Sequence, residues 1–181
     1  MFIWTFVAHM FLPLGETGVH EIPNDQGVVS AMQTSIGDAS GFYIFPGMGL
    51  GPNPSGAQKR EAMKHRNDQL ASSPSGIIVY HRPGTLFDFG RTLTVEFCTE
   101  LAEAILAISL LVEASIVTFG HRVLFVTMIG IVAAIATNVP YWNWYGFPGN
   151  YTAAYMVIQI AGFFFVGIVA ALILGKRTST V

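Results

Sequence analysis

Charged residues are scarce in this 181-residue chain. Asp, Glu, Lys and Arg make up 11% of the sequence, less than half of the roughly 25% found in an average soluble domain. The nine Lys and Arg residues and eleven Asp and Glu residues leave a formal net charge of -2. The chain therefore lacks the clustered basic surplus of a nucleic-acid-binding protein. Cys98 is the only cysteine, which excludes a disulfide scaffold.

Apolar residues, by contrast, are abundant and gather in long runs. Hydrophobic residues make up 52% of the chain, which excludes disorder. A helix needs about 20 mainly apolar residues to cross a hydrocarbon core of about 30 Å, and three runs in the second half reach about that length. The first contains Glu103 and Glu113, and the other two are uncharged. We predict transmembrane helices over about 93–119, 122–141 and 151–174.

A shorter apolar segment lies at the start of the chain. Phe2 to Leu14 would form roughly 20 Å of helix at about 1.5 Å per residue, less than a full span. It has neither the preceding basic residue nor the following A-x-A-like site of a cleaved signal peptide. Either this is a short, locally accommodated first span, or the start is assigned too late and the helix extends upstream. The sequence thus predicts a mostly α, integral membrane protein with a four-helix transmembrane bundle, the first helix lying within residues 1–14.

Residues 15–91 are predicted to form a small extracytoplasmic α+β cap between the first and second helices. Pro23-Asn24-Asp25 is a helix-start signal and Gly37 a stop. A second helix is expected over 57–71, with strands over 41–46 and 76–80. A domain of this size is marginal alone, so we expect it to lean on the membrane helices or on a partner. Residues 92–181 then hold the three remaining helices and a short tail.

The basic residues near the helix ends predict the orientation. His121 and Arg122 lie between the second and third helices, and Lys176 and Arg177 follow the fourth. Short loops rich in Lys and Arg stay cytoplasmic, so both termini should be cytoplasmic, in a plasma or bacterial inner membrane. The uncharged loop between the third and fourth helices should face outward. It carries aromatic residues typical of a membrane interface, namely Tyr141, Trp142, Trp144 and Tyr145.

Three glutamates form the main candidate site. Glu96, Glu100 and Glu103 are spaced four and three residues apart, which places their carboxylates on one face of the second helix. Ionisable residues inside a membrane are costly and are functional candidates for that reason. One interpretation is an acid/base or ion site at the outer end of this helix, with His9 as a partner. In the other, the acids stand above the bilayer, where the helix dipole favours them.

Cofactor and metal binding have less support from the residues. His9 lies in a candidate span and could ligate haem iron or chlorophyll magnesium, but the chain has no C-x-x-C-H motif. Histidines on membrane helices also hydrogen-bond neighbouring helices. No cofactor is required by the sequence, while contact with a pigment, a haem or a quinone stays open. Glu16, His20 and Glu21 form a further acid and histidine cluster, whose spacing matches no established metal-ligand motif.

Two classes of function follow. Small residues at four-residue spacing let helices approach closely, and they occur twice, as Gly130 with Ala134 and Gly167 with Ala171. Because short catalytic motifs are missing, the leading hypothesis is a non-catalytic accessory or stabilising subunit of a larger membrane assembly, such as a respiratory or photosynthetic one. Its partners would be the lipid bilayer and other membrane subunits. The alternative is a membrane enzyme or a proton- or cation-coupled protein that uses the glutamate site.

Overall fold

The computed structural model describes residues 1–177, which are mostly helical and form six helices and one two-stranded sheet. The chain divides into two compact units. A helical unit combines Met1–His20 with the chain from Phe87 onward, and a smaller unit comprises Glu21–Leu86. The elements of the helical unit are α1 (Phe2–Met10), α4 (Phe89–Glu113), α5 (Phe119–Tyr145) and α6 (Gly149–Arg177). Those of the smaller unit are α2 (Asp25–Ile36), β1 (Gly41–Phe45), α3 (Gly56–Leu70) and β2 (Gly76–Tyr80).

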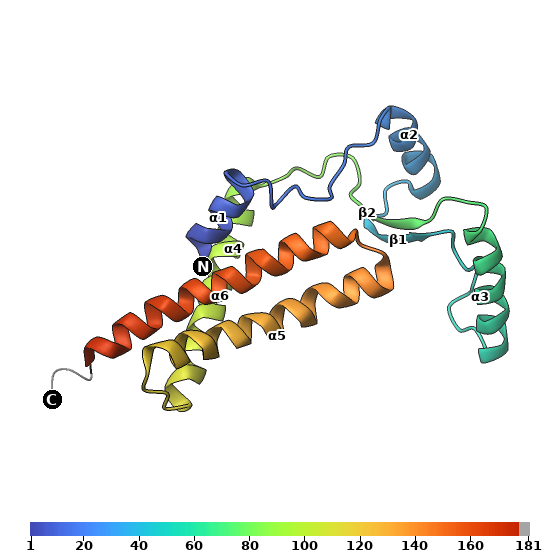
Figure 1. Ribbon diagram of the computed structural model, residues 1–181. Coiled ribbons are helices and arrows are strands. Elements are labelled where there is room, and N and C mark those ends of the chain that lie inside the picture. The colour runs from blue at the N-terminus through green and yellow to red at the C-terminus, as the bar shows by residue number, and fades with distance from the viewer. Residues whose placement is uncertain (178–181) are drawn as a thin grey trace. The chain divides into compact units, whose positions relative to one another are not determined.

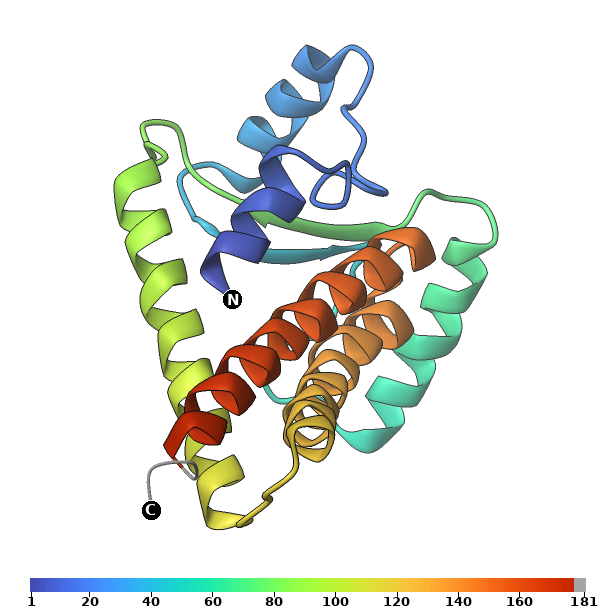
Figure 2. The same cartoon turned by 60° about the vertical axis from the view of Figure 1, so that its left-hand side comes forward.

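Helices α5 and α6 form an antiparallel hairpin and lie side by side along their length (Figures 1 and 2). Gly146, with φ 70°, ends α5 and turns the chain back. Both helices are long and apolar enough to cross a membrane. The mean hydropathy of the most apolar 18-residue window is 2.1 in α5 and 2.7 in α6. Only 17% and 39% of those windows are buried, whereas the core helix of a soluble protein would be mostly buried. Helices are confirmed over 122–141 and 151–174, and both could span a membrane by their length and composition.

Small residues bring α5 and α6 together. Gly130, Ala134, Gly167 and Ala171 are all buried. A Cβ atom added at Gly130 would lie 2.5 Å from Cβ of Phe163, and one at Gly167 would lie 3.1 Å from the carbonyl oxygen of Val123. Phe163 is 3% exposed and belongs to a core with residues of α4 and α5. Its neighbours Phe164 and Phe165 are each 41% exposed, and the ring of Phe165 contacts that of Trp4 in α1, with centroids 5.4 Å apart.

Helix α4 differs from the helix predicted over 93–119. It begins earlier because Asp88 caps it, its Oδ1 accepting a hydrogen bond from the backbone N–H of Arg91 at 2.9 Å. It also ends earlier, at Glu113, because Ser115 takes a left-handed conformation with φ 53°. The last residues of the apolar run therefore form a turn beyond the helix, and both glutamates of that run lie within α4. Among the described residues only α5 and α6 have the length and apolarity of a span, so the four-helix bundle stays a prediction.

Helix α1 is also shorter than the apolar segment that predicts it. It spans nine residues, Phe2–Met10, or roughly 14 Å at about 1.5 Å per residue. Pro13 explains the early end, because proline disfavours helical backbone at the residue before it and lacks an N–H donor. The side chain of Trp4 ties this short helix to α6, since its Nε1 donates a hydrogen bond to the carbonyl oxygen of Ile158 at 2.8 Å.

The smaller unit has the predicted order of helix, strand, helix and strand. Strands β1 and β2 pair in an antiparallel register that places Gly41 opposite Tyr80 and Phe45 opposite Gly76. The hydroxyl of Tyr80 donates to the carbonyl oxygen of Gly37 at 2.9 Å, tying β2 to the end of α2. Helix α3 begins in a capping box between Ser55 and Gln58. Neither α2 nor α3, both fully described, contains a buried residue.

Candidate functional site

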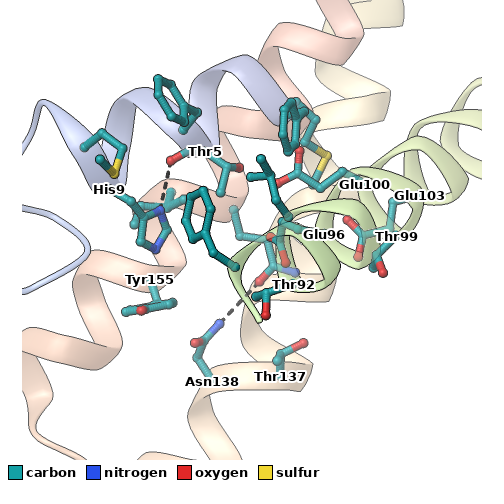
Figure 3. Close-up of a pocket in the computed structure, with 18 of the residues that line it drawn as sticks. Thr5, His9, Thr92, Glu96, Thr99, Glu100, Glu103, Thr137, Asn138 and Tyr155 are labelled. Atoms are coloured by element: carbon teal, nitrogen blue, oxygen red, sulfur yellow. Dashed lines mark hydrogen bonds between the residues drawn. The ribbon is translucent and has the colours of Figure 1, made fainter. Parts of the chain in front are cut away.

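A pocket of about 550 Å³ opens between the four helices of the helical unit (Figure 3). Its lining comes from Met1 and α1, from Phe87 and the first fifteen residues of α4, from the last turns of α5 and from the first half of α6. Because α5 and α6 are antiparallel, these segments of α5 and α6 lie at the same end of the hairpin. The polar lining residues are Thr5, His9, Thr92, Glu96, Thr99, Glu100, Glu103, Thr137, Asn138, Tyr155 and Gln159.

The three glutamates of α4 all line this pocket. Their helical spacing puts them on one face of α4, and that face is turned toward α1 and α6 (Figure 3). Their burial is graded, since Glu96 is exposed, Glu103 is half-buried and Glu100 is only 5% exposed. The Oε2 atom of Glu100 is buried and has no hydrogen-bond partner. A buried carboxylate oxygen without a partner is costly, so Glu100 is the most unusual group of the pocket.

His9 reaches the same pocket from α1. Its Nδ1 lies 2.9 Å from the carbonyl oxygen of Thr5, as the dashed line in Figure 3 marks. A carbonyl oxygen only accepts, so Nδ1 carries the hydrogen of the neutral ring and Nε2 is the acceptor. The imidazole also contacts the ring of Tyr155 edge-on, with centroids 5.8 Å apart. The fold thus brings His9 and the glutamates of α4 to one cavity, although they are far apart in the sequence.

Several polar residues of the pocket were not selected from the sequence. Asn138 donates from Nδ2 to Oε1 of Gln159 at 3.3 Å and to the carbonyl oxygen of Ala134 at 2.9 Å. Thr5 lies beside Glu100, and its side chain is within hydrogen-bonding reach of that carboxylate. The available signal was the presence of Asn138 and Gln159 in otherwise apolar runs, since polar side chains in such helices commonly bond across helices. Tyr155 and Thr5 give no comparable sequence signal.

The other candidate residues lie elsewhere. Within the described part of the chain, no group of three or more His, Cys, Asp or Glu residues could hold a metal ion. Glu16, His20 and Glu21 are therefore not gathered as a ligand set, and neither are His9 and the α4 glutamates. The aromatic residues at the end of α5 are exposed, as an interfacial role requires; they are Tyr141, Trp142, Trp144 and Tyr145.

Arg122, at the opposite end of α5, is buried rather than free in a loop. It is 6% exposed, and its Nε donates to the carbonyl oxygen of Ile116 at 2.7 Å. That bond satisfies one carbonyl of the turn between α4 and α5, so Arg122 also holds this turn in place.

Comparisons of the chain with protein-family models, with curated proteins and with solved structures found no match.

Proposed function

We propose that this chain is a membrane protein whose helical unit binds a small molecule in the pocket between α1, α4, α5 and α6. The observation that carries this proposal is Glu100, an almost fully buried carboxylate that lines the pocket and has an oxygen without a partner. Buried polar groups are normally hydrogen-bonded, and an exception calls for an explanation, of which a functional role is one. The cavity also has the size of a typical small-molecule site, and both apolar and polar side chains line it.

Native mass spectrometry of the protein, extracted gently from its own membrane, tests this proposal. Thr92 and Thr94 make a matched pair on α4, because each hydroxyl bonds a carbonyl of its own helix and only Thr92 is among the pocket-lining residues. We expect an additional small-molecule mass on the wild type and on Thr94→Trp. Thr92→Trp should lose that mass, because the indole fills the cavity. The same bound mass on all three proteins, or on none of them, would contradict the proposal.

The membrane placement forms part of the proposal and is supported by α5 and α6. We propose that α4 crosses with them, that the aromatic end of α5 faces outward and that residues 15–91 are extracytoplasmic. The basic residues at the other helix ends then face the cytoplasm, in a plasma or bacterial inner membrane. Under this orientation the pocket lies in the outer half of the bundle, with α1 as one wall.

Cysteine labelling in intact cells tests the orientation. In a Cys98→Ser background, Lys64→Cys on α3 should react with a membrane-impermeant maleimide added outside. His121→Cys, at the start of α5, should react only after the membrane is permeabilised. Both positions are exposed, so a difference in labelling reports the side of the membrane and not burial. Reaction of both cysteines, or of His121→Cys alone, in intact cells would overturn the proposed topology.

A second candidate function is an accessory subunit of a larger membrane assembly, and the smaller unit favours it. The antiparallel pairing places Phe42, Ile44 and Val79 on one face of the sheet, where all three are exposed. A folded unit that leaves such a face open needs a surface to cover it. The native mass spectra described above also test this function, since an accessory subunit should appear with protein partners at fixed stoichiometry. A chain that appears alone would contradict it.

A further inference from the structure

The charge of the pocket indicates which class of molecule it takes. Its lining residues, all within the described part of the chain, include three glutamates and neither lysine nor arginine. Apart from the α-amino group of Met1, which also lines the pocket, an anion would meet only like charge on such a surface, and a neutral molecule would leave the carboxylates largely uncompensated. Glu100 has the greatest need of a positively charged donor, because its buried Oε2 atom has no hydrogen-bond partner in the protein. A cation with N–H donors in the pocket would supply a hydrogen-bonded counter-charge that no lysine or arginine of the lining provides.

An inorganic cation does not suit this pocket. No group of three or more His, Cys, Asp or Glu residues in the described chain could hold a metal ion. Hard cations require several oxygen ligands at short distance, whereas these glutamates line a cavity of about 550 Å³ together with many apolar side chains. A volume of that size fits an organic molecule. The cation should therefore have an apolar body.

The walls of the pocket match such a body. Aromatic rings line it from three directions, with Phe2 and Phe6 from α1, Phe89 from the start of α4, and Tyr155 from α6. Aromatic faces attract organic cations through their quadrupoles, and this attraction adds to the burial of apolar surface. His9 contributes a further acceptor, because its Nδ1 is engaged with the carbonyl oxygen of Thr5 and leaves Nε2 to receive an N–H.

We propose that the pocket binds an amphipathic organic ammonium ion, with the ammonium group beside Glu100 and Glu103 and the apolar body against the aromatic rings. This inference rests on the proposed function and names its ligand class. An N–H group of a primary or secondary ammonium would donate to the carboxylate of Glu100. The buried carboxylate would thereby gain both a counter-charge and a hydrogen bond.

Calorimetric titration of the purified full chain in detergent tests this assignment with two aromatic probes of similar size. Phenethylammonium carries the charge, and 2-phenylethanol is its neutral counterpart. Phenethylammonium should bind to the wild type, and Glu100→Gln should weaken that binding by about tenfold or more, the effect of losing a charged hydrogen bond. Glu113→Gln, at the exposed far end of the same helix, should leave the affinity within about twofold. Glu103→Gln provides a second reduction in pocket charge if Glu100→Gln does not fold.

The outcomes separate this assignment from the proposed function. Binding of phenethylammonium that depends on Glu100, with weaker binding of 2-phenylethanol, supports the assignment. Equal binding of the two probes, unchanged in Glu100→Gln, overturns the ammonium class and leaves a small-molecule pocket. If neither probe binds while native mass spectra show another molecule that Thr92→Trp expels, the ammonium class is again overturned and the proposed function stands. The absence of both probe binding and bound mass overturns the two together.

Discussion

Gly130→Leu is expected to lower the melting temperature of the protein by about 3 to 10 °C, because the side chain has no room between α5 and α6. Even a single added Cβ at this position would lie 2.5 Å from Cβ of Phe163 and 2.8 Å from Cγ of the same ring. Phe163 cannot retreat easily, since it is 3% exposed and packs in a core with Ala107, Leu111 and Val126. The two helices would have to separate, which would also open the pocket that they help to line.

Thermal unfolding of the detergent-solubilised protein measures this effect, and Gly120→Leu is the matched control. Gly120 lies in the first turn of the same helix, and a Cβ built there meets nothing within 4 Å. Leucine is a better helix former than glycine by about 0.8 to 1 kcal/mol, so the control should keep or slightly raise the melting temperature. Equal melting temperatures for the two variants would contradict close packing of α5 on α6 at Gly130.

Much of the secondary structure could be predicted because it is local. Uncharged apolar runs gave α5 and α6, and turn residues such as Gly37 gave the limits of the elements in the smaller unit. The end of α4 could not be predicted in this way. The apolar run continues to Phe119, while the helix stops at Glu113 because Ser115 adopts a positive φ. That conformation is rare for serine, and no pattern of hydrophobicity reports it.

The candidate site shows the same division between local and tertiary information. Helical periodicity alone put Glu96, Glu100 and Glu103 on one face, because that depends only on spacing within one helix. It could not show that Glu100 is the buried member of the three. Its burial follows from α1, which lies over this part of α4 through the Phe2–Phe97 ring contact and is held on α6 by Trp4. Such contacts between distant segments have no periodic signature.

Glu100→Met is expected to raise the melting temperature of the ligand-free protein by several degrees and to abolish its binding of phenethylammonium. The carboxylate is almost fully buried, and its Oε2 has no partner, so the folded state bears the desolvation cost of a polar group without a compensating bond. Replacing buried charged groups with apolar residues of similar volume is often neutral or stabilising, by about 1 to 4 kcal/mol. Stability gained together with binding lost is the behaviour of a residue kept for function.

Glu113→Met is the control for Glu100→Met. Glu113→Met, at an exposed position on α4, should change the free energy of unfolding by no more than about 0.5 kcal/mol. If Glu100 instead serves the fold, through its neighbour Thr5 for example, Glu100→Met would break a needed contact. The melting temperature would then fall by several degrees, since loss of a hydrogen bond to a buried charged group costs about 1.5 to 3 kcal/mol. A fall would make Glu100 a structural residue, and a rise with loss of binding would make it the centre of the ligand site.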